Sequence, residues 1–271
     1  MSQSFEISSF NNVTTLTLNN PDKHNALDAS FWEKFPAMIR MLQNDKTRVL
    51  VLKANGKSFC SGLDISIFSN PKLFAIEKPL ERERFMQLVA LLQDALSTLR
   101  NSRFPVIAAI QGPCIGAGLD LVSACDMRYA TKNAYFRLAE INLGLMADLG
   151  TLQLLPDSLP SPTVAEMAYT GCDLTPERAA EQGFLNNVFS STDEMYDEVQ
   201  KVAETISGKA PLAIHQTKLA LKYRQEGHGV SDSLNYAALL QACLIDTEAI
   251  RASFKKDAVY HDLKEVPDGI E

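Results

Sequence analysis

The chain has 271 residues, of which 46% are hydrophobic and 22% are charged, and its formal net charge at pH 7 is -7. This length can bury a full hydrophobic core, and the composition excludes a disordered or collagen-like chain. The negative balance argues against a nucleic-acid-binding protein, which needs a basic surface to neutralise phosphates.

Strands and helices are predicted to alternate in the first half of the chain. Residues 13–18 (VTTLTL) alternate like a half-buried strand, and short apolar runs typical of buried strands occupy 48–54 (RVLVLKA) and 105–110 (PVIAAI). Helices are predicted between them at 28–43, with Asp28 as the N-cap, and at 81–99. Strands separated by helices indicate βαβ crossovers and therefore an α/β fold.

Shorter elements and then long helices are predicted in the second half. The short strands are MRYA (127–130) and AYFRLAE (134–140), and the short helices are 149–155, 162–170 and PERAAEQG (176–183). Beyond residue 190 we predict only long helices, roughly at 192–207, 211–225 and 230–252. The chain is therefore divided into a core at residues 1–190, which carries the site, and a helical region at residues 191–271, which packs on the core or on a neighbouring subunit.

The stretch IGAGLDLVSACDMRY (115–129) raises a question about Asp120. If this stretch opens a helix, the residues one turn from Asp120 are all small, namely Gly116, Ala117, Ser123 and Ala124. Such a face should press against another part of the protein. A carboxylate at this position indicates that the stretch is not helical, that the group lies at the surface, or that it works in a site.

Two glycine-containing loops follow predicted buried strands, namely NGKSFCSGLDI (55–65) and QGPCIGAG (111–118). Each loop can turn backbone N–H groups toward a common pocket, and one donor from each would make an oxyanion hole. Alternatively, the glycines only permit tight strand-to-helix turns. Neither loop is a phosphate-binding loop, because GxxxxGK[ST] and GxGxxG are both absent.

These loops carry a resemblance to a known family. SFCSGLDI, followed by AAIQGPCIGAGLDLVSACDMRYA and FRLAEINLGLMADLGTLQLLP, resembles the enoyl-CoA hydratase/isomerase family, the crotonases, and so does NNPDKHNAL near the N-terminus. The resemblance is strong over about residues 10–190 and weaker over the helical tail. It implies a crotonase-like spiral of βαβ (ββα) turns, a C-terminal helical trimerisation region and an acyl-CoA thioester substrate.

The resemblance also implies an oxyanion hole made by the backbone N–H groups of Leu63 and Ala117. The family commonly has glycine at the position of Ala117. Because alanine disfavours a positive φ, we expect an ordinary helical or bridge conformation at this residue.

Three carboxylates are candidates for proton transfer, namely Asp120, Glu140 and Asp148. From the local pattern alone, Glu140 could be an exposed carboxylate at the end of a strand, and Asp148 could be the N-cap of the helix that follows. The resemblance implies instead that these carboxylates belong to the catalytic site. Hydratases of the family grip one water with glutamates at the first two positions, whereas they tend to have a neutral residue at the third.

Asp, Glu and Asp at these positions resemble the Δ3,5-Δ2,4-dienoyl-CoA isomerases of the family. Their reaction takes a proton from C2 of a 3,5-dienoyl-CoA and returns one to C6. The resemblance implies that Asp148 is the C2 base, that Glu140 is the C6 acid and that Asp120 supports both. Burial and like charge should raise the pKa of at least one of these acids.

The predicted function is therefore the isomerisation of a 3,5-dienoyl-CoA to a 2,4-dienoyl-CoA in fatty-acid β-oxidation. An enoyl-CoA hydratase and a Δ3-Δ2-enoyl-CoA isomerase remain alternatives within the enzymes. A catalytically inactive crotonase-fold scaffold or RNA-binding protein is the alternative without turnover.

Contacts with the CoA part of the substrate are predicted from family positions for Lys23, Ala26, Ser61 and Asp64. Lys255 and Lys256 could reach the CoA phosphates, also from a neighbouring subunit. The alternatives are a solvated turn residue for Lys23 and ordinary surface charge for the lysine pair.

No metal and no separate cofactor are predicted, because neither the four histidines nor the five cysteines have metal-ligand spacing. Cys114 and Cys125 lie in apolar runs and are expected to be buried free thiols. We predict a homotrimer or hexamer with no nucleic-acid or membrane partner. A cytoplasmic location is predicted because no signal-like N-terminus, membrane-spanning run or SKL-type C-terminus is evident.

Overall fold

The computed structural model describes residues 4–69, 76–247 and 250. Its larger sheet has the strand order β1-β2-β3-β4-β6-β9, in which β1 pairs antiparallel with β2 and the other neighbours are parallel. These strands are β1 (Phe5–Phe10), β2 (Val13–Leu18), β3 (Val49–Ala54), β4 (Val106–Ile110), β6 (Met127–Thr131) and β9 (Asn187–Phe189). A smaller sheet has the order β5-β7-β8 and consists of β5 (Pro113–Ile115), β7 (Tyr135–Arg137) and β8 (Asp173–Leu174).

The described α-helices follow the predicted order. They are α1 (Ala29–Gln43), α2 (Pro79–Arg100), α3 (Ala117–Ser123), α4 (Thr151–Leu154), α5 (Ser161–Thr170), α6 (Pro176–Glu181), α7 (Thr192–Ser207), α8 (Pro211–Gln225) and α9 (Val230–Ala242). Short 3-10 helices lie at η1 (Pro21–Lys23), η2 (Ile65–Ser69), η3 (Glu140–Leu143) and η4 (Leu155–Asp157). The predicted cap of α1 is confirmed, since Asp28 accepts a hydrogen bond from the Phe31 amide at 2.8 Å.

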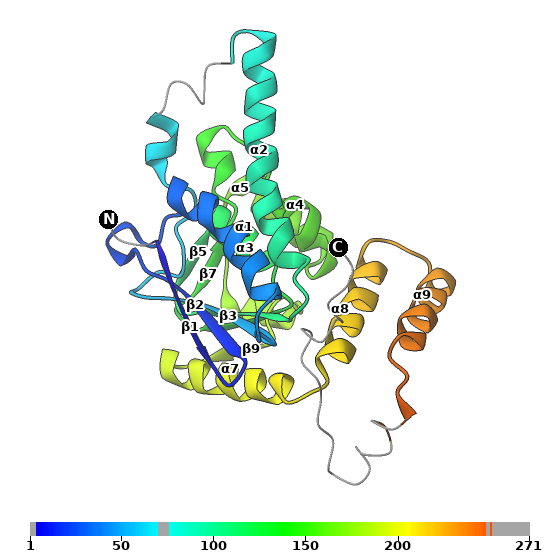
Figure 1. The fold of residues 1–271 in the computed structure, drawn as a ribbon. Helices are drawn as coiled ribbons and strands as arrows, with labels where there is room; N and C mark the ends of the chain where they lie inside the picture. Colours follow the sequence, from blue (N-terminus) through cyan, green and yellow to red (C-terminus); the bar gives the residue numbers. More distant parts are fainter. Residues whose placement is uncertain (1–3, 70–75, 248–249, 251–271) are drawn as a thin grey trace.

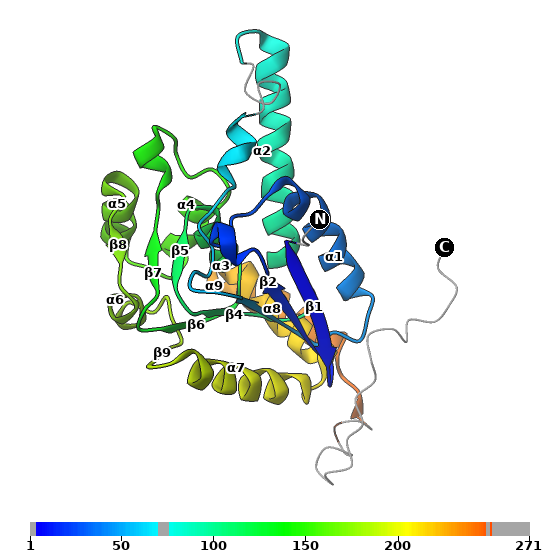
Figure 2. The same cartoon turned by 90° about the vertical axis from the view of Figure 1, so that its left-hand side faces the viewer.

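The two faces of the larger sheet are covered by different helices, as alternation along β3 shows. Leu50 and Leu52 point into a large core shared with α1 and α2, whereas Val49 and Val51 point into a second buried cluster completed by α7. Figure 2 shows α7 running beneath the sheet. A strand buried on both faces reads as a continuous apolar run, which is why VLVLKA was recognisable in the sequence.

The first strand, β1, was not predicted. It is an edge strand whose residues after Phe5 are exposed, so it lacks a clear apolar pattern. The signal that could have revealed it is the pair Asn11 and Asn12, which turn the hairpin with φ values of 50° and 65°. Asparagine tolerates this left-handed backbone, and two such residues in a row are typical of a two-residue hairpin turn.

The C-terminal helices differ in how they attach to the body. Although α7 belongs to the predicted helical region at 191–271, it packs on the sheet, and the boundary near residue 190 stays a prediction. The ammonium group of Lys218 on α8 donates to Ser102 Oγ, Phe104 O and Asp126 Oδ2 at 2.8–3.2 Å, so this buried cation has all three donors used. In contrast, α9 packs mainly against α8 at the side of the molecule (Figure 1).

The predicted helix at 230–252 is corrected by the structure, in which α9 ends at Ala242. The Ile250 amide donates to the Asp246 carbonyl, so helical pairing starts again at Asp246. Asp246 stands at the N-cap position of this second helical segment, a position that aspartate favours. No described helix has both the length and the hydrophobicity that crossing a bilayer would require.

Candidate active site

The two glycine-containing loops lie against each other at the carboxyl ends of β3 and β4. The Phe59 and Cys60 amides donate to Pro113 O at 3.0 Å, and the Ile115 amide donates to Cys60 O at 2.9 Å. A Cβ atom added to Gly62 would stand 3.1 Å from Ile115 O and 3.5 Å from the Ala117 nitrogen. The absence of a side chain at Gly62 therefore lets the first loop approach the second one closely.

The Leu63 and Ala117 amides are both available as donors. Pairing of the Leu63 segment with Leu27 uses Gly62 O and the Asp64 amide, at 2.8 and 3.0 Å, which leaves the intervening Leu63 N–H unpaired. Ala117 is the first residue of α3, where an N–H has no partner within the helix. In the described ranges neither amide donates to another protein group.

The backbone turn before α3 is made by Gly116 and not by Ala117. Gly116 has φ 52° and ψ -123°, the conformation of the first central residue of a type II′ turn, which strongly favours glycine. Ala117 is not among the residues with positive φ, so the expected ordinary conformation is confirmed. The chain reverses at Gly116, and Ala117 can then begin the helix without strain.

Asp120 lies in the helix α3, and its side chain is buried, with 2% of the residue exposed. The amide of Thr151 donates to its Oδ1 at 2.7 Å, and the Thr151 hydroxyl makes a second, short hydrogen bond to the same oxygen. Burial raises the pKa of Asp120 to about 7, the Thr151 hydrogen bonds oppose this rise, and the charges of Glu140 and Asp148 add to it. Of the three readings of this residue, both a non-helical segment and a surface position are therefore wrong.

Glu140 does not end a strand, which corrects the expectation for AYFRLAE. The strand β7 ends at Arg137, whose carbonyl accepts a hydrogen bond from the Gly116 amide, and Glu140 begins η3. The carboxylate is half-buried, and its Oε2 atom is buried without a hydrogen-bond partner among the described residues. Burial, and then the charge of Asp148, raises the pKa of Glu140.

Glu140 also lies directly over the second loop. A Cβ atom added to Gly116 would stand 2.9 Å from Glu140 Oε1. The acid is therefore held close to the residue that precedes the Ala117 donor.

Asp148 is not the N-cap of α4, so that alternative is wrong. The N-cap is Gly150, with φ 133°, and the carboxylate that reaches the first amide of α4 comes from Asp120. The half-buried Asp148 is instead held through its backbone carbonyl, which accepts a hydrogen bond of 2.6 Å from Gln93 on α2. Burial raises the pKa of Asp148.

The structure thus brings the three predicted acids into one cluster beside the two loops. The charges of Glu140 and Asp148 raise the pKa of Asp120, and the charge of Asp148 raises the pKa of Glu140, so the three groups are close enough to interact. Like charges that share a site titrate as a coupled set, so a carboxylic acid and a carboxylate can coexist near neutral pH. One member can accept a proton while another donates one.

Lys23, Ala26, Ser61 and Asp64 come together on one side of the first loop. Lys23 Nζ donates to Asp64 Oδ2 at 2.8 Å, Ser61 Oγ donates to Lys23 O at 3.3 Å, and the Ala26 amide donates to the same carbonyl at 3.0 Å. The hydrogen bond from Lys23 lowers the pKa of Asp64 to about 2, helped by hydrogen bonds from Ser66. Asp64 is buried and forms an ion pair with the exposed Lys23.

The contact of these four residues with CoA stays a prediction, and Lys255 and Lys256 lie outside the described residues. Sequence reasoning did not find Gly116 as the turn residue, Thr151 as the partner of Asp120, or Gln93 as the partner of Asp148. Gly116 has a sequence signal, because a glycine directly before a predicted helix often makes the turn. Thr151 and Gln93 have none, since their partners lie 31 and 55 residues away along the chain.

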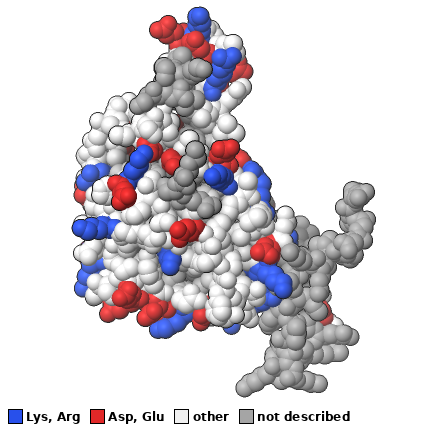
Figure 3. Space-filling model, turned by 60° about the vertical axis from the view of Figure 1, so that its left-hand side comes forward, with Lys and Arg blue, Asp and Glu red and all other residues white. Residues whose placement is uncertain are grey.

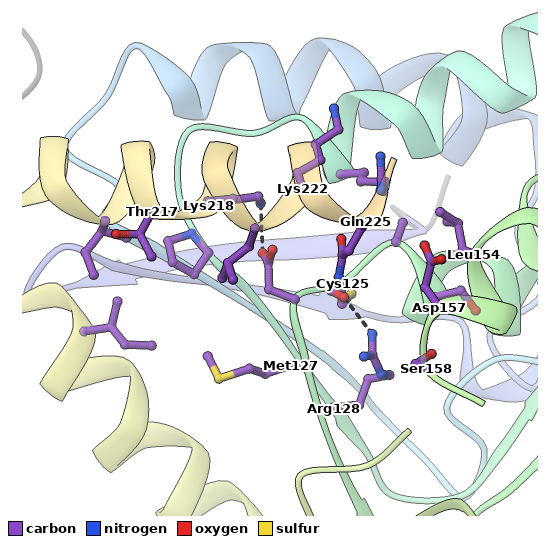
Figure 4. Close-up of a pocket in the computed structure, with 18 residues that line it drawn as sticks. Cys125, Met127, Arg128, Leu154, Asp157, Ser158, Thr217, Lys218, Lys222 and Gln225 are labelled. Atoms are coloured by element: carbon purple, nitrogen blue, oxygen red, sulfur yellow. Dashed lines mark hydrogen bonds and ion pairs between the residues drawn. The ribbon is translucent and has the colours of Figure 1, made fainter. Parts of the chain in front are cut away.

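A separate cavity of about 290 Å³ lies between α8 and the body of the protein (Figure 4). Lys218, Lys222, Arg128 and Asp157 are among the residues that line it, and none of the predicted site residues that the structure describes does. In this view Arg128 points back at the end of α3, where it donates to the Cys125 carbonyl at 2.6 Å.

Cys60, Cys114 and Cys125 are buried free thiols, which confirms the expectation for the latter two. Among the described residues no group of three His, Cys, Asp or Glu side chains is arranged to hold a metal ion. The absence of a metal stays a prediction.

Comparison with known proteins agrees with this architecture. Residues 8–257 match the enoyl-CoA hydratase/isomerase family. The chain is 35% identical to the peroxisomal Delta(3,5)-Delta(2,4)-dienoyl-CoA isomerase of Arabidopsis thaliana, over 90% of each chain, and 32% identical to the mitochondrial enzyme of that name from Homo sapiens, over 94% of this chain and 78% of that one. The crystal structure of an enoyl-CoA hydratase from Mycobacterium smegmatis matches with a TM-score of 0.83 at 28% identity, covering 94% of this chain and 97% of that one. The chain therefore belongs to the enoyl-CoA hydratase/isomerase family of enzymes and has the crotonase fold.

Proposed function

We propose that the protein is a Δ3,5-Δ2,4-dienoyl-CoA isomerase of fatty-acid β-oxidation. The observation that carries this proposal is the third acid, Asp148, whose charge acts on both Asp120 and Glu140. Moving two conjugated double bonds needs one group to accept a proton and another to deliver one at the far end of the diene. The similarity to two proteins named as dienoyl-CoA isomerases supports the same reaction.

The substrate in this proposal is an acyl-CoA whose thioester oxygen lies between the N–H groups of Leu63 and Ala117. Asp148 takes a proton from C2, and the charge that develops on the thioester oxygen is stabilised by the two donors. Each preorganised donor of this kind stabilises the transition state by about 3 kcal/mol. The double bonds move from C3=C4 and C5=C6 to C2=C3 and C4=C5 as Glu140 delivers a proton to C6.

The protonation states that this mechanism needs are supported by the site. Glu140 must begin as a carboxylic acid, and burial together with the charge of Asp148 favours its protonated form. Asp148, the less buried of the two, begins as a carboxylate. After each turnover the two groups have exchanged roles, and one proton must pass through solvent or through the cluster to restore them.

Other functions find less support. A hydratase needs its acids to hold a water and has no use for a third acid, although the structure from Mycobacterium smegmatis bears the name of a hydratase. An RNA-binding scaffold would display a basic surface, whereas positive and negative side chains are interspersed on the face in Figure 3. A cytoplasmic location stays a prediction, and two relatives are named as peroxisomal and mitochondrial proteins.

The test is to supply the purified protein with a 3,5-dienoyl-CoA and to follow both the 2,4-dienoyl product and the exchange of the C2 proton with deuterated solvent. Asp148→Asn should abolish the exchange, because the base is gone. Glu140→Gln should retain much of the exchange and lose product formation. Each loss should be on the order of 10²–10⁴-fold in rate.

The matched control is Glu177→Gln, which removes an exposed carboxylate on α6 and should leave both rates unchanged. Rapid C2 exchange in Asp148→Asn, or normal turnover in Glu140→Gln, would show that the roles are assigned wrongly. Hydration of a 2-enoyl-CoA without isomerisation of the diene would favour the hydratase.

A further inference from the structure

We infer that Thr151 is a positioning residue of this site, which fixes Asp120 and sets its charge through two hydrogen bonds to one carboxylate oxygen. The inference rests on the proposed function for its catalytic consequence. Its structural part, the control of the charge on Asp120, can be measured without any substrate.

The helices α3 and α4 are joined by hydrogen bonds to one atom, Asp120 Oδ1. Thr151 is the first residue of α4, it is fully buried, and both its amide and its hydroxyl reach Asp120 Oδ1. The N-cap of α4, Gly150, has no side chain with which to satisfy that amide. Asp120 therefore takes the place of a capping side chain from a different helix, α3.

Among the described groups around Asp120, only Thr151 stabilises the ionised carboxylate. Glu140 from η3 and Asp148 from the segment before α4 both oppose its ionisation. The Cys114 thiol from β5 also faces it, and burial raises the pKa of that thiol well above its usual value, so it stays neutral. Among the described residues no lysine or arginine pairs with Asp120. The two bonds from Thr151 are the interactions there that lower the pKa of Asp120.

The charge on Asp120 matters to its neighbours because like charges repel. An ionised Asp120 favours a protonated Glu140, which is the form that delivers a proton to C6 in the proposed mechanism. A protonated Asp120 would remove this bias and could itself retain the proton. Thr151 thus acts on the reaction without touching the substrate.

Two substitutions separate this role from simple packing. Thr151→Val keeps the branched shape and loses the hydroxyl, whereas Thr151→Ser keeps the hydroxyl and loses the methyl group. A hydrogen bond to a charged group changes proton affinity by about tenfold or more, so Thr151→Val should raise the pKa of Asp120 by about one unit. Thr151→Ser should leave it near the wild-type value.

The direct measurement is a pH titration of the protonated carboxyl C=O band by difference infrared spectroscopy, with the band assigned by its loss in Asp120→Asn. In parallel, the pH profile of kcat should move to higher pH in Thr151→Val by the same amount. A rise of about one unit from about 7 lowers the ionised fraction of Asp120 at pH 7 about fivefold, so kcat at pH 7 should fall about fivefold with little change in KM. Thr151→Ser should restore the wild-type profile. If Thr151→Val folds poorly, Thr151→Ala supplies the second hydroxyl-free variant.

Equal titration of Asp120 in the valine and serine variants would overturn the inference, as would a larger shift in the serine variant. If the wild-type protein fails to isomerise a 3,5-dienoyl-CoA while Thr151→Val shows the expected infrared shift, the proposed function is overturned and the control of Asp120 by Thr151 remains. If the wild-type protein isomerises the substrate and Thr151→Val shows no infrared shift, the control of Asp120 by Thr151 is overturned and the proposed function remains.

Discussion

At the scale of single residues, Asp120 is a buried acid whose ionised form lowers the stability of the folded protein. An ionised carboxylate is costly to bury, and within the described part of the chain it is compensated by two hydrogen bonds from Thr151. An amide of the same shape would fit there at less cost, so packing alone does not explain a carboxylate at this position. Its raised pKa also makes it a measurable source of pH dependence in folding.

Asp120→Asn should remove part of the pH dependence of stability. The pKa of Asp120 is raised from 3.8 to about 7, so between these values the folded protein binds more protons than the unfolded chain. The free energy of unfolding of the wild type should therefore fall as pH rises through this window, by on the order of 3 kcal/mol from this group. Asparagine can still accept both Thr151 hydrogen bonds and carries no charge, so the variant should lack this fall.

Urea denaturation at pH 4.5 and pH 8 measures this difference. Asp197→Asn, which changes an exposed aspartate on α7, is the matched control and should follow the wild type. An Asp120→Asn variant that loses as much stability as the wild type over this range would show that Asp120 keeps an ordinary pKa.

At the scale of elements, the short turn between β5 and α3 decides where the Ala117 donor points. Gly116 holds a backbone conformation that disfavours any side chain, and its Cα lies against Glu140. One residue thus sets both the direction of an oxyanion-hole donor and the room for an acid. The other loop approaches through Gly62, so the site depends on two glycines from segments about fifty residues apart.

Gly116→Ala should damage activity more than stability. The new Cβ would meet Glu140 Oε1 at 2.9 Å, and the strained backbone should cost about 1–3 kcal/mol. We expect kcat/KM to fall on the order of 10²-fold, because the Ala117 N–H and Glu140 are both displaced. Gly144→Ala is the matched control, since Gly144 also has a positive φ, 73°, but a Cβ there would meet nothing within 4 Å.

The control should lose about 1 kcal/mol of stability and keep its activity within a few-fold. Kinetics with the dienoyl-CoA and thermal denaturation of both variants provide the comparison. Equal activity of Gly116→Ala and Gly144→Ala would mean that the turn does not position the site.

At the scale of the whole molecule, the helices α8 and α9 leave apolar surface exposed. Val230, Leu234 and Leu239 on α9 are 64%, 66% and 68% exposed, and α9 packs mainly on α8 through stacking of Tyr223 and Tyr236. Figure 1 shows the two helices at the side of the body. Exposed apolar side chains along one helix mark an interaction surface, and we propose that further copies of this chain cover it in a trimer or hexamer.

Leu234→Glu combined with Leu239→Glu should shift the protein to a monomer without unfolding it. Charged side chains cannot be buried in the interface at low cost, whereas they are tolerated on an exposed helix. Sedimentation velocity at micromolar concentration measures the assembly, and circular dichroism checks the fold. Phe10→Glu, at a residue on β1 that is 70% exposed, should leave the assembly intact, and a monomeric wild type would contradict the proposal.

Much of the fold could be predicted from the sequence because its larger elements carry a local pattern. The apolar run of β3, the cap at Asp28 and the extents of α7 and α8 depend on burial and capping that recur within a few residues. The acids at 120, 140 and 148 were found through motifs that resemble a family. In contrast, β5 and β8 have three and two residues, too few for any period to be recognised, and they exist because β7 pairs with both.

The sequence by itself determined the α/β class, the family and the identity of the acids, since these depend on residue types and on spacing along the chain. Only the tertiary structure decided how the acids are held. The bond between Thr151 and Asp120 joins residues 31 apart, the pair of Lys23 and Asp64 joins residues 41 apart, and the approach of Glu140 to Gly116 depends on the pairing of β5 with β7. Contacts of this kind have no periodic signature, because they arise only when packing brings distant segments together and removes water from around their charges.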